Sequence, residues 1–371
     1  MNGTKLEKLR RKIDRIDAKF ISLVAQRLET TENIGYLKRS RGAVVEDPAR
    51  KAEVLERAAQ LASAKDVRPE FISAIMSQMM LEAEEVQRGG RPTIAFQGER
   101  GAYSEAAGNS LFPQKIFIPC ETFRQVFEAV ESGEAQYAIV PIENSTEGSI
   151  NEVYDLLLEK QLHIHAETVV QVRHCLMADR EASLAEIMEV YTHPQALAQC
   201  RKFIEQKLPY ARIIPFYDTA GAAKMIAENG KRNIAAIASQ AAAKYYGLKE
   251  LAAGIEDNRS NFTRFLLLSK ATAEKPENPK TSLVFSLKHK PGALFSALRP
   301  FADKGINLTK IESRPTKGTP WEYLFYMDFE GDAREGKFAE AIEQLKEFAE
   351  FFKLLGVYEK AKRNGSADGN E

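Results

Sequence analysis

The sequence predicts three domains of different fold class: an all-α domain, then an α/β domain, then an α+β domain. The chain has 371 residues, which is too long for one ordinary hydrophobic core and suits two or three domains. Glycine, proline and charged residues interrupt the apolar pattern at residues 89–92 and again at residues 275–280, as expected of linkers. The spacing of the apolar residues also changes at each interruption. We therefore predict domains at residues 1–90, 92–270 and 280–360.

The overall composition excludes several classes of function. Lysine plus arginine and aspartate plus glutamate both number 52, so no net charge attracts nucleic acid or an anionic membrane. The first twenty residues are too charged for a signal peptide, and no later stretch is long and apolar enough to span a membrane. Cys120, Cys175 and Cys200 lack the spacing of a zinc or redox site, which indicates reduced thiols and no metal. We expect a cytoplasmic protein.

Residues 4–39 form one predicted helix, interrupted only by Gly35. Such a helix would be about 54 Å long, against about 30 Å for a small domain. The first domain is too small to bury it, so we hypothesise an intertwined dimer in which a second copy covers the exposed apolar stripe. Asp47 and Pro48 provide the N-cap and first turn of the next helix.

Two basic residues lie inside the apolar stripe of the first helix. Arg27 and Lys38 share a helix face with Leu9, Ile13, Ile16, Phe20 and Ile34. A single basic residue there could reach solvent or pair with a carboxylate. Two favour a buried anion, because an unpaired buried charge is very costly. Arg10 lies outside the stripe and is expected to serve a different site. Gln87, on an apolar face of the third helix, needs a partner.

The first ninety or so residues resemble the all-helical chorismate mutases. The residues that carry the resemblance are Leu9-Arg10, Arg27, Gly35, Lys38, Asp47, Arg50 and Gln87. The resemblance implies an intertwined three-helix dimer in which Arg10 reaches the partner's site. It implies that Arg27 and Arg50 bind substrate carboxylates and that Lys38 and Gln87 hydrogen-bond the ether oxygen. Asp47 would join the substrate-binding set.

These residue types suit a pericyclic rearrangement, which needs no nucleophile or base. It needs a fixed chair conformer and positive donors where charge grows on the breaking C–O bond. Two positions depart from the family's pattern. Lys51 stands where a glutamate usually contacts the substrate hydroxyl, and Ala83 replaces a common serine. We therefore expect weakened mutase activity.

The second domain alternates short apolar runs with helical stretches, which predicts α/β structure. Several strands run into polar loops that open helices, and such loops offer backbone N–H groups to anions. Taken singly, Asn144, Ser145 and Thr146 read as a capping cluster and His193 as a hydrogen-bonded loop histidine. His163 and His165 lack a cysteine or carboxylate at ligand spacing, so no metal is expected there.

Residues 92–270 taken together resemble the prephenate dehydratases. The signatures are residues 98–104 (GERGAYS), 143–149 (ENSTEGS), 193–195 (HPQ) with Gln199-Cys200, and 261–265 (NFTRF). The family more often has threonine-phenylalanine where this chain has Ala102-Tyr103, and serine where it has Thr192. The resemblance implies two α/β lobes like those of a periplasmic-type binding protein, with the site in the cleft between them.

The resemblance also implies roles for individual residues. Prephenate loses a hydroxyl and a carboxylate to become aromatic, and Thr263 would donate a hydrogen bond to the leaving hydroxyl; its own acidity is too low to supply the proton. Substrate orientation falls to Asn144, Ser145, Thr146, Thr192, His193 and Gln199. Arg264 pairs either with a substrate carboxylate or within the protein, and the sequence leaves both open. No cofactor is expected.

From residue 281 to about residue 358 the order is strand, helix, strand, strand, helix, strand, which predicts a ferredoxin-like α+β fold. Residues 290–294 (KPGAL) and 311–315 (IESRP) could be a plain turn and an exposed strand end. Beside a dehydratase domain they resemble the ACT domains that bind phenylalanine at a dimer interface. The expected contacts are Gly292, Ala293, Leu294, Glu312, Ser313 and Arg314.

The combined expectation is a bifunctional homodimer that acts on chorismate and prephenate and is inhibited by L-phenylalanine. One alternative keeps the dehydratase and treats the N-terminal helices mainly as a dimerisation module, a reading that Lys51 favours. Another is a non-catalytic ligand-binding sensor, against which the intact Thr263 argues.

Overall fold

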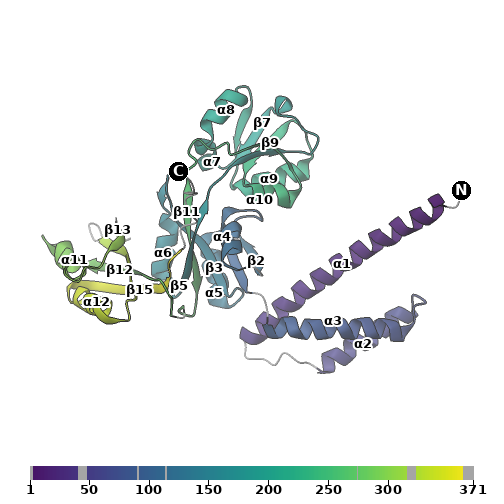
Figure 1. Ribbon diagram of the computed structural model, residues 1–371, viewed down its shortest axis with the longest axis horizontal. Helices are drawn as coiled ribbons and strands as arrows, with labels where there is room; N and C mark the ends of the chain where they lie inside the picture. Colours follow the sequence, from purple (N-terminus) through teal and green to yellow (C-terminus); the bar gives the residue numbers. More distant parts are fainter. Residues whose placement is uncertain are drawn as a thin grey trace, which may run out of the picture. The chain divides into compact units, whose positions relative to one another are not determined.

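The computed structural model describes residues 3–40, 48–89, 92–112, 115–273, 275–315 and 323–361. Its contacts divide the chain into two compact units (Figure 1). The helical unit comprises residues 1–93 and 114–116, and the larger unit comprises residues 94–113 and 117–371. Within the described ranges, no helix has the length and apolar character needed to cross a membrane.

The helical unit consists of α1 (Gly3–Ser40), α2 (Pro48–Ser63) and α3 (Pro69–Gly89), as the sequence predicts. Helix α3 contacts both of the others. The apolar stripe of α1 is not covered within the chain, since Leu9, Ile13, Ile16 and Phe20 each remain more than half exposed. A long helix with such a stripe requires a further apolar surface against which to pack.

The first lobe of the middle segment is built on five strands of a mixed sheet. They are β1 (Thr93–Gln97), β2 (Ile116–Cys120), β3 (Tyr137–Asn144), β5 (His163–Gln171) and β11 (Phe262–Ser269), with the short β4 (Gly148–Ser149) paired to β3. The helices of this lobe are α4 (Tyr103–Leu111), α5 (Phe123–Ser132) and α6 (Asn151–Glu159). Strand β11 lies between β5 and β3, in the interior of the sheet.

The second lobe has its own five-stranded sheet in the order β10-β6-β9-β7-β8. Its strands are β6 (Cys175–Ala178), β7 (Glu189–Thr192), β8 (Arg212–Pro215), β9 (Ile234–Ala238) and β10 (Lys249–Ala253). Its helices are α7 (Pro194–Gln199), α8 (Arg201–Lys207), α9 (Thr219–Asn229) and α10 (Gln240–Tyr246), with a short 3₁₀ turn at Leu184–Glu186. The chain crosses between the lobes twice, after β5 and before β11.

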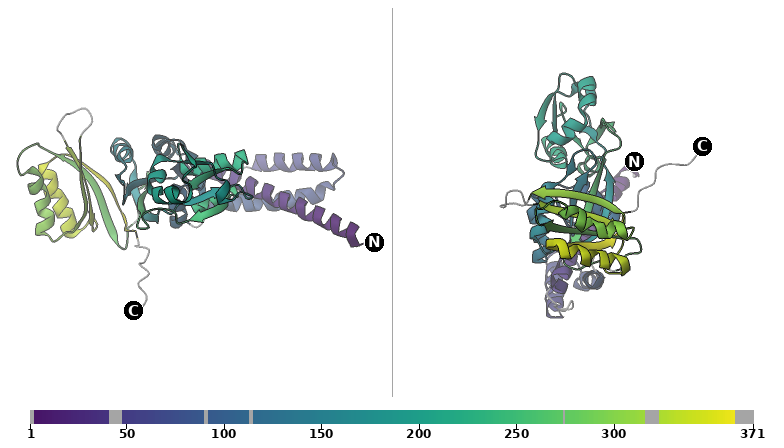
Figure 2. Two further views of the ribbon diagram at one scale, coloured as in Figure 1. Left: turned by 90° about the horizontal axis from the view of Figure 1, so that it is seen from above. Right: turned by 90° about the vertical axis from the view of Figure 1, so that its left-hand side faces the viewer.

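The C-terminal segment has the predicted element order. Its elements are β12 (Pro279–Leu287), α11 (Ala293–Asp303), β13 (Leu308–Pro315), β14 (Tyr323–Glu330), α12 (Gly336–Phe348) and β15 (Ala349–Glu359). Helices α11 and α12 lie on one face of its sheet (Figure 2). The core on that face includes Leu283, Phe285, Phe301 and Met327.

The opposite face of this C-terminal sheet packs against the first lobe. Val284, Tyr326 and Tyr358 belong to the same buried cluster as Val140 and other residues of the first lobe. Strand β15 also pairs with β5, so that the two sheets form one continuous sheet of ten strands in the order β13-β14-β12-β15-β5-β11-β3-β1-β2, with β4 on β3. The predicted linker therefore runs directly into a strand, because β12 already begins at Pro279.

Candidate active site

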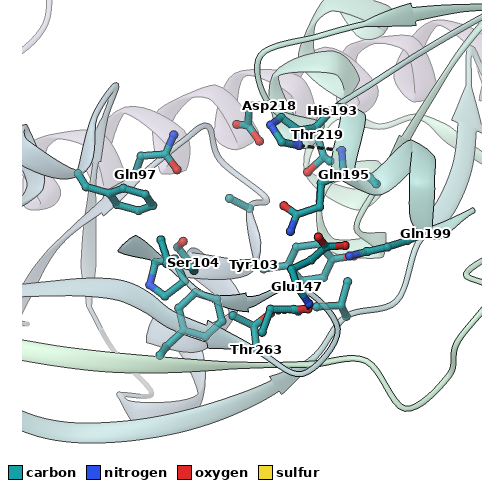
Figure 3. A pocket seen from close by; sticks show the side chains of 18 of the residues that line it. Gln97, Tyr103, Ser104, Glu147, His193, Gln195, Gln199, Asp218, Thr219 and Thr263 are labelled. Carbon is teal, nitrogen blue, oxygen red and sulfur yellow. Dashed lines mark hydrogen bonds between the residues drawn. The ribbon is translucent and has the colours of Figure 1, made fainter. Parts of the chain in front are cut away.

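A cavity of about 580 Å³ lies between the two lobes of the larger unit. Residues of the first lobe's sheet, including Asn144, Thr263 and Phe265, line one side of it. Residues at the starts of α7 and α9, including His193, Gln195 and Thr219, line the other (Figure 3). We call this cavity the cleft. Its position between two α/β lobes is the one the sequence predicts.

Thr263 and Asn144 form a hydrogen-bonded pair at the cleft. They are register partners on β11 and β3, and both are buried. Asn144 Nδ2 lies 2.9 Å from Thr263 Oγ1, 2.8 Å from Asn261 Oδ1 and 3.3 Å from the carbonyl of Phe262. Because an amide nitrogen can only donate, Thr263 Oγ1 accepts this bond and its own proton stays available to a molecule in the cleft.

The other end of the Asn144 side chain organises the following loop. Asn144 Oδ1 accepts hydrogen bonds from the backbone N–H groups of Thr146 at 2.9 Å and Glu147 at 3.0 Å. These bonds close a turn after β3 and do not cap a helix, since the next helix, α6, begins after Ile150 without a side-chain cap. The capping reading of this motif is therefore wrong, and of its three residues Asn144 lines the cleft. Asn144 uses its carbonyl to hold the loop and its amide to hold Thr263, so its side chain is fixed at both ends.

The structure adds a histidine that the sequence reading missed. Tyr103 donates to the carbonyl of Arg173 at 2.5 Å, and its oxygen lies 3.2 Å from His174 Nδ1. His174 Nε2 lies 2.9 Å from the side-chain amide of Gln199, and all three side chains line the cleft. Burial lowers the pKa of His174, against the opposing effects of Gln199 and Glu256. A neutral imidazole therefore fixes the Gln199 amide.

His174 lies where the chain crosses from β5 to the second lobe. It is not part of any of the motifs that carry the family resemblance. The weak signals for it were Tyr103 in the first signature and Gln199 in the third, both of which it contacts.

The cleft contains neutral donors and helix starts. Several helices, among them α4, α7 and α9, begin at residues that line it, and the first N–H groups of a helix favour anions. The described lining also holds Glu147 and Asp218 but neither lysine nor arginine. Asp218 caps α9 by accepting from Ala220 and also accepts from the backbone of Glu99. Carboxylates of a ligand would thus meet backbone N–H groups and neutral side chains.

Four of the predicted dehydratase residues lie outside the lining of the cleft. Thr192 is buried and donates to the carbonyl of Ile237 at 2.9 Å. Ser145 accepts from the backbone of Phe262 and donates to the carbonyl of Ser260. Thr146 is exposed. Thr192 and Ser145 thus bond to backbone groups of neighbouring segments, and none of these three residues lines the cleft.

Arg264 is the fourth and most informative of these corrections. Successive residues of a strand face opposite sides, so Thr263 faces the cleft and Arg264 faces away from it. Its guanidinium contacts Glu167 and Asp328, both at 2.7 Å, and Tyr358 at 3.0 Å. The sequence left open whether Arg264 pairs with a substrate carboxylate or within the protein. In the structure it pairs within the protein.

Arg10, Arg27, Lys38, Arg50 and Gln87 lie on the three helices of the helical unit. Arg27 donates to the carbonyl of Met79 at 3.4 Å, Arg10 is exposed and Lys38 is half-buried. Arg50 pairs with Glu53 at 2.6 Å near the surface. Asp47 lies outside the described residues, as does the side chain of Gln87.

A second cavity of about 280 Å³ lies in the C-terminal segment. We call it the ACT cavity. Of the predicted phenylalanine contacts, Ala293, Leu294 and Ser313 line it. Its other lining residues, which the sequence reading missed, are Leu287, Lys288, His289, Lys290, Tyr323 and Phe325. Gly292 caps α11 with a positive φ of 78° and is not part of the lining.

Glu312 and Arg314 belong to the same motif but point elsewhere. Alternate residues of β13 face opposite sides, so Ser313 faces the ACT cavity while Glu312 and Arg314 face the dehydratase lobe. Glu312 accepts a 2.5 Å hydrogen bond from Ser149, and Arg314 donates to the carbonyl of Asn151 at 2.8 Å. Within this chain, Glu312 and Arg314 therefore do not line the ACT cavity.

Comparison with known proteins covers all three segments. Residues 94–273 match the family Prephenate dehydratase, residues 9–88 match Chorismate mutase type II, and residues 281–347 match the ACT domain. A Bifunctional chorismate mutase/prephenate dehydratase of Aquifex aeolicus is 36% identical over 368 residues, which are 96% of this chain and 98% of that protein. Arogenate dehydratase/prephenate dehydratase 2 of Arabidopsis thaliana is 46% identical over 286 residues, 74% of each chain.

Among solved structures, the prephenate dehydratase of Arthrobacter aurescens in complex with L-Phe has a TM-score of 0.67 at 36% identity. The match covers 72% of this chain and 90% of that one. The chain studied here therefore belongs to the family of bifunctional chorismate mutase/prephenate dehydratases.

Proposed function

We propose that this protein rearranges chorismate to prephenate in its helical segment and converts prephenate to phenylpyruvate in the cleft, under inhibition by L-phenylalanine. The observation that carries the dehydratase assignment is the pair of Asn144 and Thr263. The Asn144 amide donates to Thr263 Oγ1, which leaves the threonine proton free to donate into the cleft.

In the proposed dehydratase reaction the ring C–O bond and the bond to the ring carboxylate both break. Hydroxide leaves from one end of the ring with the C–O electron pair and takes up a proton to become water. The electrons of the carboxylate bond complete the aromatic ring as carbon dioxide departs. A hydrogen bond from Thr263 stabilises the charge that grows on the departing oxygen.

The other cleft residues orient the substrate. The Gln199 amide, held by His174, contacts a polar group of prephenate. The N–H groups at the start of α4, which has no side-chain cap, receive a substrate carboxylate, since the described lining offers no lysine or arginine. Two lobes joined by two crossings, as in a periplasmic-type binding protein, would close around the substrate and exclude water.

The proposed mutase site is completed by a second copy of the chain. A partner helix would cover the apolar residues of α1, which are exposed in the single chain. Arg10 would then reach the partner's site, where Arg27, Lys38, Asp47, Arg50 and Gln87 surround chorismate. We also propose that the protein is a cytoplasmic homodimer. Its proposed domain limits are residues 1–90, 92–270 and 280–360.

The proposed effector site is the ACT cavity. Leu294, Tyr323 and Phe325 offer apolar and aromatic contacts, and Lys288 and Lys290 lie beside them. These residue types suit an aromatic amino acid, whose ring needs an apolar surface and whose carboxylate needs positive charge.

The function is tested with the purified full chain in two assays, chorismate consumption and phenylpyruvate formation from prephenate. Both activities should be present, and phenylalanine should lower the second. Phenylpyruvate formation without chorismate consumption would mean that the helical unit serves mainly as a dimerisation module. The absence of both activities, with phenylalanine still bound in calorimetry, would leave a ligand-binding sensor.

A further inference from the structure

Two adjacent residue pairs lie where β3 and β11 reach the cleft. Thr263 of β11 is the register partner of Asn144 of β3, and Arg264 is the register partner of Glu143. Because side chains alternate along a strand, the first pair faces the cleft and the second faces the opposite side. We call Glu143 and Arg264 the rear pair. Both of its members are held by residues of the C-terminal sheet.

Three strands of the C-terminal sheet hold Arg264. Asp328 of β14 and Tyr358 of β15 contact its guanidinium, and Ser282 of β12 lies 2.6 Å from both of these side chains. On the side of the first lobe, Arg264 contacts Glu167 of β5, which also pairs with Lys280 at 3.1 Å. These contacts connect β11, the strand that carries Thr263, to strands β12, β14 and β15 of the C-terminal sheet.

The charges of this cluster balance. It holds two cations, Arg264 and Lys280, and two anions, Glu167 and Asp328, and none of these four side chains is more than 15% exposed. Burial raises the pKa of Asp328, but Arg264 and Lys280 together hold it below its ordinary value. Removing one of these four side chains would leave a buried charge without its partner. The cluster therefore tolerates little displacement of Arg264.

The remaining strand, β13, holds Glu143. Lys310 Nζ lies 2.8 Å from Glu143 Oε2 and 3.0 Å from Glu312 Oε2, and its side chain is 13% exposed. Glu312 in turn accepts a 2.5 Å hydrogen bond from Ser149, and Ser149 lines the cleft. Strand β13 therefore contacts the loop from Glu143 to Ser149 at both ends.

The backbone is irregular at the same place. The register of β11 against β3 shifts between Arg264 and Phe265, where Phe265 pairs with Pro141 and Ile142 is left over. Such bulges redirect the neighbouring side chains and are common beside active sites. With a bulge on one side and the strand end on the other, the direction of Thr263 depends on what holds the residues beside it.

We propose that the C-terminal sheet is a working part of the dehydratase site, and that Lys310 and Arg264 are positioning residues that orient Asn144 and Thr263 through the rear pair. The inference rests on the proposed role of Thr263 in the cleft. Strand β13 also lines the ACT cavity through Ser313, one residue from Glu312. An occupant of that cavity thus acts on the cleft through Glu312, Ser149 and Lys310.

The positioning role is tested by a double-mutant cycle without effector, with Lys310→Met, Glu143→Gln and the two combined. Each single variant should lower the dehydratase kcat roughly tenfold with KM changed less than about twofold, since small misplacement of a reacting group is costly in rate. The double variant should fall no further, because both changes break the same contact. Lys304→Met, which removes an ion pair of the same segment with Glu340, should leave kcat unchanged.

Three outcomes of this cycle would overturn the proposal. They are unchanged kcat in the single variants, additive losses in the double variant, or a fall explained by a lower fraction of folded protein in thermal melts. Arg264→Lys provides a second measurement, because it keeps the charge but loses the forked contact with two carboxylates. It should also lower kcat more than KM. Thr263→Ala in the same series separates the two hypotheses, since normal turnover there would refute the role of Thr263 alone.

The route from the ACT cavity is tested with Glu312→Gln. Inhibition by saturating phenylalanine should weaken at least about threefold in this variant, while calorimetry of the substrate-free protein shows phenylalanine affinity changed less than about twofold. A parallel loss of affinity would mean that Glu312 is part of the effector site. Undiminished inhibition with unchanged affinity would mean that the contact with Ser149 carries no coupling.

Discussion

The dehydratase cleft and the helical unit differ in how far one chain completes a site. In the cleft, Thr263, Asn144, Gln199 and His174 come from distant parts of the sequence and hydrogen-bond in two groups. In the helical unit, Arg27 donates to the backbone of α3 and Arg10 is exposed. The first site is built by the topology of one chain. For the second, our proposal requires a second copy of the chain.

The difference follows from what each fold buries. The lobes of the larger unit enclose their apolar residues, and the strand ends are then fixed by neighbouring strands on both sides. The long helix α1 has no such enclosure, since its apolar stripe is more than half exposed. We therefore expect changes in the cleft to act within one chain and changes in α1 to act through the dimer.

The largest effect is expected from Thr263→Ala. Loss of one donor to a developing oxyanion costs about 3 to 4 kcal/mol, so dehydratase turnover should fall roughly a hundredfold or more. Mutase activity should not change, because Thr263 belongs to the larger unit. The conservative variant Thr263→Ser keeps the hydroxyl and should retain most of the turnover. Equal losses in both variants would point to packing of the methyl group in place of the hydrogen bond.

Removing a cation from the helical unit should give the next largest effect. Truncating one partner of a buried charge pair costs roughly 2 kcal/mol or more, so Arg27→Ala should lower mutase kcat/KM at least about thirtyfold. Dehydratase turnover should remain normal. Arg15→Ala removes an exposed arginine of the same helix and serves as the control. If both arginine variants lose mutase activity alike, α1 contributes general charge and no specific contact.

A pH profile would sharpen the comparison further. His174 is neutral in the folded protein because burial lowers its pKa below the ordinary value of about 6.5. The unfolded chain therefore gains a proton first as the pH falls, and the stabilisation present above about pH 6.5 is lost on acidification toward the folded pKa. Once His174 is protonated in the folded state, both ring nitrogens donate, and the buried ring carries a positive charge beside Gln199 and the cleft.

Below the folded pKa of His174, dehydratase turnover should then fall by about tenfold per pH unit, as expected when a single protonation inactivates an enzyme. None of the five histidines lies in the first ninety residues, so the mutase activity of the same protein provides the reference. His174→Asn should lose turnover at neutral pH and show a flatter acid limb. An acid limb that is unchanged in the variant would assign the titration to another group.

Most of the fold was predictable, because strand and helix periods are local properties of the sequence. The three helices and the order of elements after residue 280 appear as expected. The continuous sheet was not predictable. It depends on β15 pairing with β5, which joins residues almost two hundred positions apart, and no local pattern specifies such a contact.

The same contrast between local patterns and long-range contacts explains which site residues could be predicted. Asn144 and Thr263 could be named from their motifs, and the structure brings them together. Arg264 and Glu312 stand in equally clear motifs, yet they face away from the cavities assigned to them, since a motif does not tell which face of a strand each residue takes. His174 was missed because it stands outside every motif and acts through Gln199.

The smallest expected effect comes from Lys51→Glu. Lys51 follows Arg50 on α2, where the related mutases usually have a carboxylate that accepts a hydrogen bond from the substrate hydroxyl, and an ammonium cannot accept one. Restoring the acceptor should raise mutase kcat by about threefold, the net value of one modest hydrogen bond. Lys51→Met removes the cation without adding an acceptor, so it separates the two contributions. If methionine raises turnover as much as glutamate does, repulsion by the cation explains the weakness of the site. If glutamate lowers turnover while sedimentation shows an intact dimer, position 51 does not face the substrate hydroxyl, and the two sites differ less in completeness than the single chain indicates.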